Sequence, residues 1–152
     1  MKLVRYIYLA GCWLFGIFCG VGHTVFELGP KTPETLKLME ILRGFPVSMP
    51  GTQTNAYALT LGVSLIMGLM LVAYGVANLL ILRDTPAPEL PKTVYLLMNV
   101  LFSGTAFILA WKYLFLIPIA FTGLAVLCFV ISLGIALLRT TPPALALTKA
   151  RK

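Results

Sequence analysis

The chain has 152 residues, of which 59% are hydrophobic and 11% are charged. Soluble domains have about 45–50% apolar and about 25% charged residues, and a domain of this size leaves much of its surface exposed. The composition therefore excludes an ordinary soluble domain. The formal net charge is +7, but no basic cluster is interleaved with aromatic residues, which argues against nucleic-acid binding. The basic residues instead indicate membrane topology and contact with anionic lipid.

Four apolar stretches are long enough to cross about 30 Å of hydrocarbon, namely residues 3–26, 55–82, 94–110 and 116–138. Backbone polar groups must be satisfied within lipid, so all four stretches are expected to be helices. The first stretch is too long for the core of a signal peptide and is expected to be retained. The sequence thus predicts a single all-α domain over residues 1–152, an integral membrane four-helix bundle.

Lysine and arginine residues are divided unequally between the two sides that the four stretches define. With the N-terminus inside, the inner side holds eight of them and the outer side holds four. Basic residues favour the cytoplasmic side. We therefore expect a multi-pass inner-membrane protein with both termini cytoplasmic and with residues 140–152 as a basic cytoplasmic tail.

The polar stripe of the first stretch is its main feature. At 100° per residue, one arc of about 100° holds most of its small and ionisable residues, which are Arg5, Cys12, Gly16, Cys19, Gly20, His23 and Glu27. The opposite side is apolar and is expected to face lipid, as at Phe18, Val21 and Val25. Gly16 and Gly20 form a GxxxG motif. It indicates close helix packing, either inside the chain or in a homodimer or other membrane complex.

The first loop, residues 27–54, is expected on the outer side and contains one short helix. Thr32 can cap this helix, Pro33 suits its first position, and Gly44 can close it. Apolar residues recur at helical spacing, so the helix is expected to be amphipathic and to lie on the outer membrane surface or over the bundle. Prolines and Gly51 then predict a rigid, turned return to the second stretch.

Cysteine spacing argues against redox or metal chemistry. Cys12 and Cys19 are seven residues apart on one expected helix, about 10.5 Å along its axis, which is too far for a disulfide. Cys128 lies in another apolar stretch, and the chain has no CxxC motif and no Cys/His cluster. The sequence therefore predicts no metal site and no cofactor.

His23 and Glu27 are the best candidate site because they are four residues apart and can touch on one helix face. A carboxylate beside an imidazole holds its tautomer, as a general base or proton relay requires. Alternatively, the pair fixes the helix end, or it binds a ligand headgroup together with Arg43. A metal site is the weakest interpretation, because a third ligand would have to come from Glu34 or Glu40.

Asn78 and Asn99 lie on polar stripes of the second and third stretches. Amide side chains within lipid-facing helices bond most simply between helices, and this is the interpretation that we favour. The alternative is that both residues line a polar cavity and contact a ligand there.

Several short stretches carry a family resemblance. They are His-Thr-Val-Phe-Glu-Leu-Gly-Pro from His23, Thr32-Pro-Glu, Leu38-Met-Glu, Arg43-Gly-Phe, Pro50-Gly, Ile108-Leu-Ala-Trp-Lys-Tyr-Leu-Phe and Pro118. Through them, nearly the whole chain resembles a family of small bacterial inner-membrane proteins with four predicted helices. The resemblance implies the fold and implies no activity. A looser similarity to DoxX-like membrane proteins rests on size and helix number.

The leading functional hypothesis is a non-enzymatic binding or accessory protein for a lipid-like or other apolar ligand or partner. The ligand would lie between the helices under the first loop, with its polar head near His23, Glu27 and Arg43. Asn78 and Asn99 are further ligand-binding candidates. One alternative is a membrane-embedded enzyme that uses His23 and Glu27 as an acid–base pair on a hydrophobic substrate. The other is a structural subunit of a membrane complex.

Overall fold

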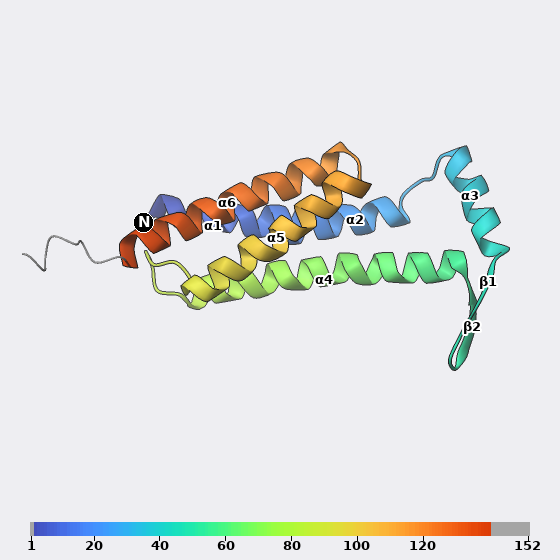
Figure 1. Ribbon diagram of the computed structural model, residues 1–152, viewed down its shortest axis with the longest axis horizontal. Helices are drawn as coiled ribbons and strands as arrows, with labels where there is room; N and C mark the ends of the chain where they lie inside the picture. Colours follow the sequence, from blue (N-terminus) through green and yellow to red (C-terminus); the bar gives the residue numbers. More distant parts are fainter. Residues whose placement is uncertain (1, 141–152) are drawn as a thin grey trace, which may run out of the picture.

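The computed structural model describes residues 2–140, with the side chain of Thr140 excepted (Figure 1). From residue 141 onward, the predicted basic tail lies outside the described residues. Within the described range, four helical segments are long and apolar enough to cross a membrane. The first consists of α1 (Lys2–Cys12), the π-helix η1 (Trp13–Phe18) and α2 (Cys19–Leu28), and the others are α4 (Ala56–Asp84), α5 (Thr93–Tyr113) and α6 (Leu116–Thr140).

The predicted order and positions of the four long helical segments are confirmed, and only their ends differ. The expected third helix ended at Ala110, where the apolar run stops, but α5 continues through Lys112 to Tyr113. A lysine near a helix end keeps its ammonium group in water without interrupting the backbone hydrogen bonds. Hydropathy therefore underestimates helix length wherever a polar residue occupies the last turn.

The short helix of the first loop is α3 (Pro33–Arg43), and its predicted ends are confirmed. The Thr35 backbone N–H donates to the Thr32 hydroxyl oxygen over 3.3 Å, so Thr32 caps the helix. Gly44 follows its last residue. Figure 1 shows α3 running across the direction of the long helices, beyond the end of α2.

The return from α3 to α4 contains a β-hairpin that the sequence analysis did not predict. Strands β1 (Pro46–Met49) and β2 (Thr52–Asn55) pair antiparallel, with Met49 opposite Thr52. Pro50 and Gly51 make the turn, and Gly51 has a φ of 84°. Proline followed by a residue of positive φ is the pattern of a type II turn. The all-α prediction therefore holds for the described part of the chain except for these two short strands.

Glycine contacts bring the first helical segment against α4. A Cβ atom added to Gly75 would lie 2.7 Å from the Cα of Gly16, and one added to Gly20 would lie 2.8 Å from the carbonyl oxygen of Gly68. Only glycine allows backbones to approach so closely. The GxxxG motif therefore packs against α4 inside the chain, and a homodimer or other complex through Gly16 and Gly20 stays a prediction.

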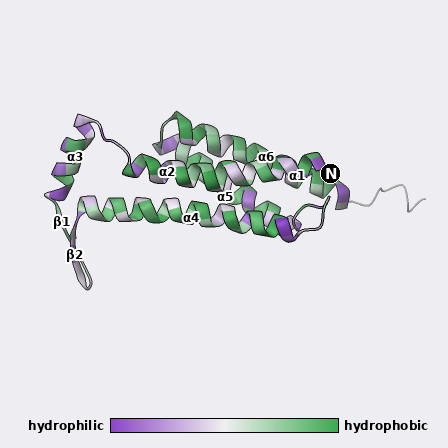
Figure 2. Cartoon of the chain, turned by 180° about the vertical axis from the view of Figure 1, so that it is seen from behind, coloured by the Kyte–Doolittle hydropathy of each residue, from purple (hydrophilic) through white to green (hydrophobic). Residues whose placement is uncertain are grey.

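The burial of the first helical segment follows the predicted stripe, although η1 interrupts the α-helical geometry. Cys12, Gly16 and Gly20 are buried, whereas Phe18 and Val25 are exposed. The lipid-facing side that the sequence predicts is thus the exposed side of the molecule. Figure 2 shows the corresponding distribution, with hydrophobic residues along the long helices and hydrophilic residues gathered in α3 and near the N-terminus.

The bundle has two different ends, which we call the terminal end, with the N-terminus and the α4–α5 linker, and the loop end, with α3, the hairpin and the α5–α6 turn (Figure 1). Asn78 and Asn99 are hydrogen-bonded, and each lies six residues from the terminal end of its helix. The two helices are therefore level at the terminal end. Because α4 has 29 residues and α5 has 21, α4 extends about 12 Å further at the loop end.

Candidate functional site

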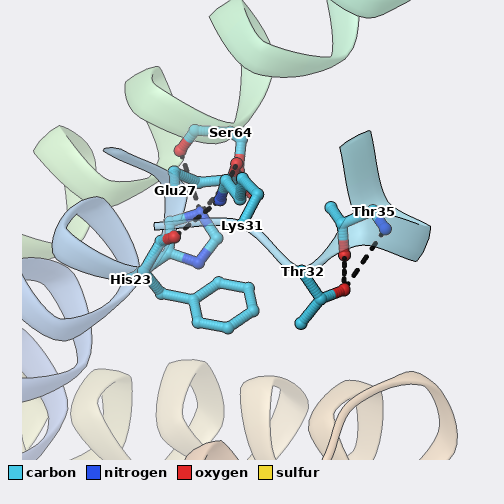
Figure 3. Close-up of polar contacts among 7 residues, drawn as sticks. His23, Glu27, Lys31, Thr32, Thr35 and Ser64 are labelled. Carbon is cyan, nitrogen blue, oxygen red and sulfur yellow. Dashed lines mark hydrogen bonds and ion pairs between the residues drawn. The ribbon is translucent and has the colours of Figure 1, made fainter. Parts of the chain in front are cut away.

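His23, Glu27, Lys31 and Ser64 form a polar group near the loop end, which we call the loop-end cluster (Figure 3). The Ser64 hydroxyl donates to Glu27 Oε1 over 2.8 Å. The Nε2 atom of His23 lies 2.8 Å from Ser64 Oγ and 3.1 Å from the Ser64 carbonyl oxygen. Ser64, which is buried on α4, therefore lies between two side chains of α2.

The partners of His23 assign its tautomer. The Ser64 carbonyl oxygen can only accept, and the Ser64 hydroxyl already donates its proton to Glu27. Nε2 must therefore carry a hydrogen and donate to both Ser64 oxygens. In the neutral ring, Nδ1 is then an acceptor, and within residues 2–140 it has no hydrogen-bond partner. One ring nitrogen is therefore held by the protein, and the other has no hydrogen-bond partner among the described residues.

Lys31 completes the cluster from the segment between α2 and α3. Its ammonium nitrogen lies 3.9 Å from Glu27 Oε2 and donates to the Phe26 carbonyl oxygen over 2.7 Å. The side chains of Lys31 and Glu27 are 14% and 24% exposed, so both are largely covered by the protein. A cation at the last carbonyl groups of a helix is favoured by the helix dipole. Lys31 therefore closes α2 and adds a positive charge to the cluster.

The order of donors limits the chemistry of the cluster. A nucleophilic serine donates its proton to a histidine base, whereas Ser64 donates to a carboxylate and accepts from His23. Within the described residues, His23 and Glu27 share no direct hydrogen bond or ion pair, and Ser64 bridges them. This geometry suits the recognition of a polar group better than the activation of a nucleophile.

An apolar groove of about 300 Å³ lies between α2 and α4. Its lining residues are Val21, Thr24, Val25, Leu65, Leu69 and Val72. The groove follows the glycine contact between the two helices, because Gly20 meets Val72 there. Toward the loop end of the groove, Leu65 directly follows Ser64 in the chain, and Thr24 directly follows His23. The groove therefore reaches the level of the loop-end cluster, and none of the four cluster residues lines it.

Asn78 and Asn99 belong to a separate buried group, the core cluster, which also contains Tyr8 and Tyr74. The Tyr8 hydroxyl donates to Asn78 Oδ1 over 2.9 Å, and the Tyr74 hydroxyl donates to Asn99 Oδ1 over 2.8 Å. The asparagines are 5% and 1% exposed. The two side chains bond to each other between α4 and α5, as the favoured interpretation of the sequence predicts. The side-chain oxygen of each asparagine also accepts a hydrogen bond from a tyrosine hydroxyl.

Arg43 lies apart from both clusters. Its guanidinium carbon is 4.7 Å from the centre of the Tyr57 ring, at the junction of α3 and α4. No hydrogen bond or ion pair within residues 2–140 joins it to His23 or Glu27. The predicted ligand-binding residues are therefore distributed over three places, and of these only the loop-end cluster contains a histidine and a carboxylate.

Sequence reasoning did not predict that Ser64 bridges His23 and Glu27, and it missed Lys31, Tyr8 and Tyr74 as partners. A signal was present for the tyrosines. Tyr8 lies four residues before Cys12 and Tyr74 lies four residues before Asn78, so each shares a helix face with a stripe residue. Lys31 gave no such signal, because it follows the end of α2 at Leu28.

The chain matches no family model, no curated protein and no solved structure. The resemblance to small bacterial inner-membrane proteins and to DoxX-like proteins therefore stays a prediction.

Proposed function

We propose that the protein is a non-enzymatic, multi-pass inner-membrane protein that binds a lipid-like amphiphile at the contact between α2 and α4. The acyl part lies in the apolar groove, and the polar head lies at the loop-end cluster. The single observation that carries the proposal is that this groove reaches the level of Ser64, which bridges His23 and Glu27. An apolar groove with a polar group at one end is complementary to an amphiphile.

The polar head would meet both donors and acceptors. Lys31 supplies a positive charge, Glu27 supplies a carboxylate, and the free Nδ1 atom of His23 supplies an acceptor. Burying a charge in lipid is costly unless it is paired, and Lys31 and Glu27 are paired at 3.9 Å. The cluster can therefore lie near the hydrocarbon boundary without a ligand and still offer hydrogen bonds to one.

Binding is favoured over acid–base catalysis by the position of Ser64. A catalytic pair would need His23 and Glu27 in direct contact and facing the substrate, whereas Ser64 separates them. A purely structural subunit is less favoured because a groove of about 300 Å³ along α2 and α4 would have no role in it.

The proposed orientation places both termini in the cytoplasm and the loop end outside. Its support is the division of lysine and arginine along the sequence, eight against four between the two predicted sides, together with the rule that such residues remain cytoplasmic. The loop-end cluster would then lie near the outer surface of the inner membrane, where it meets lipid of the outer leaflet.

Native mass spectrometry in mild detergent tests the proposal through a variant that fills the groove. Leu69 lines the groove and is 65% exposed, so Leu69→Trp should remove any amphiphile that co-purifies with the wild-type chain. Leu80→Trp is the matched control, because Leu80 lies on the same helix, is 48% exposed and is outside the groove. We expect the amphiphile to be retained by this control.

A second variant examines the polar head. His23→Ala should reduce retention several-fold, because a hydrogen bond contributes about 0.5–1.5 kcal/mol. Bare protein in the wild-type sample, or equal retention in the Leu69→Trp and Leu80→Trp variants, would contradict the proposal. Either result would favour the structural-subunit alternative, and the measured mass would give the oligomeric state.

A further inference from the structure

A second concave site lies away from the loop-end cluster, between the end of α3 and the hairpin. This hollow has a volume of about 610 Å³ and is lined by both strands and by Arg43. None of its lining residues belongs to the loop-end cluster or to the groove between α2 and α4. Its ligand can therefore be considered independently of the proposed amphiphile.

Arg43 is held in this hollow without a partner for its charge. The guanidinium group stacks on Tyr57, with 4.7 Å between its carbon and the ring centre. Among the described residues, no carboxylate pairs with it and no acceptor takes a hydrogen bond from it. This cation–π contact holds the guanidinium beside the ring and leaves its five N–H groups free to donate.

The other polar lining residues also offer donors. Ser48, Gln53, Thr54 and Asn55 line the hollow, and no aspartate or glutamate does. The Oδ1 atom of Asn55 accepts from the Ala58 backbone N–H over 2.8 Å, which leaves the Asn55 NH₂ group as a donor. The hollow therefore combines one unpaired positive charge with hydroxyl and amide donors and has no negative charge of its own.

We infer that this hollow binds a phosphate group. The planar fork of Arg43 matches two phosphate oxygens, and the hydroxyl and amide residues of the hairpin line the same hollow. A carboxylate has only two oxygens and would leave more of these donors unused. The phosphate is carried either by the headgroup of an outer-leaflet lipid or by a small soluble anion, since the hollow opens beside the end of α4.

Two measurements on the full chain in a neutral maltoside detergent test the inference and separate the two sources. Isothermal titration calorimetry with inorganic phosphate detects binding of the free anion. Native mass spectrometry after exchange into mixed phosphatidylglycerol and phosphatidylcholine micelles detects retention of the anionic lipid. We expect Arg43→Gln to weaken whichever signal the wild type gives by about tenfold or more, because charge-assisted hydrogen bonds are lost.

Lys37→Gln is the matched control, since Lys37 is an exposed cation of the same helix and does not line the hollow. It should leave either signal unchanged. Arg43→Lys should fall between wild type and Arg43→Gln, because it keeps the charge and loses the fork. Gln53→Ala removes a donor on the hairpin, at a residue that caps no helix, and should also weaken binding. This variant tests the inference if Arg43→Gln does not fold.

Each outcome has one meaning. Loss of phosphate heat in Arg43→Gln supports a site for a soluble anion. Loss of phosphatidylglycerol retention without any phosphate heat in the wild type supports a lipid headgroup. Neither signal in the wild type, or equal signals in Arg43→Gln and Lys37→Gln, overturns the inference.

Discussion

The side-chain nitrogen of Asn99 lies 2.7 Å from Asn78 Oδ1, and this hydrogen bond joins α5 to α4 within the apolar bundle. The same oxygen of Asn78 accepts from the Tyr8 hydroxyl of α1. Three helices therefore meet at one acceptor atom. A polar contact among apolar helices fixes their register, because sliding either helix would leave buried donors without partners.

Replacing Asn78 by leucine should destabilise the bundle. Asn78→Leu keeps a side chain of similar size and removes the acceptor shared by Tyr8 and Asn99. The buried Tyr8 hydroxyl then loses its acceptor, whereas the Asn99 NH₂ group keeps Tyr8 and Tyr95 as partners. A buried donor without a partner costs roughly 1–3 kcal/mol, so we expect a lower midpoint in a thermal scan in detergent. Thr105→Val is the control, since Thr105 is exposed on α5. Equal loss in both variants would mean that the core cluster has no special role.

Adding one methyl group at the glycine contact should also destabilise the protein. The Cβ of Gly75→Ala would lie 2.7 Å from the Cα of Gly16 and would force α1–η1–α2 away from α4, at a cost of roughly 1–3 kcal/mol. Gly104→Ala meets nothing within 4 Å and should be neutral or stabilising, because alanine favours the helix. A thermal scan of both variants is the measurement, and the prediction fails if Gly75→Ala is as stable as Gly104→Ala.

Removing Arg5 should loosen the linker between α4 and α5. Its guanidinium donates to the carbonyl oxygens of Leu82, Thr85 and Glu89, so it holds both the end of α4 and the linker. We expect Arg5→Gln to increase hydrogen–deuterium exchange over residues 85–90. Arg83→Gln removes only an exposed ion pair with Asp84, which contributes little, and its exchange should match the wild type. A protected linker in Arg5→Gln would show that other contacts hold it.

The proposed orientation predicts which loops react from outside. Ser48 lies in the hairpin at the loop end and Glu89 lies in the linker at the terminal end. Ser48→Cys should react with a membrane-impermeant maleimide in intact cells, and Glu89→Cys should react only after permeabilisation. The unmodified chain gives the background, because its three cysteines lie within the apolar helices. The reverse labelling pattern would contradict the proposed topology and indicate the opposite orientation.

The sequence predicts this fold well where a residue acts through its own helix. The cap at Thr32 and the end at Gly44 depend only on neighbouring residues, and both are confirmed. The exposed side of the first segment follows from helical spacing, and Phe18 and Val25 lie there. These features depend on local geometry, so the sequence around each residue is sufficient to predict them.

The arrangement of the candidate site was harder to predict because it depends on contacts between distant segments. Spacing correctly placed His23 and Glu27 on one face, yet a serine from α4 separates them. Spacing could not show that Lys31 folds back onto Phe26, or that Arg43 stacks on Tyr57 instead of joining the cluster. The hairpin was missed because its strands have only four residues each and little hydrophobic alternation.

In the proposed membrane arrangement, the unequal lengths of α4 and α5 have a consequence for the surrounding lipid. With 29 and 21 residues, the two helices are about 43 Å and about 31 Å long, and they are level at the terminal end. Hydrocarbon about 30 Å thick therefore matches α5, whereas α4 exceeds it. In the proposed orientation this hydrophobic mismatch falls entirely on the outer leaflet, so lipid beside α4 should be more stretched than lipid beside α5. The molecule would then favour positions where the membrane itself changes thickness.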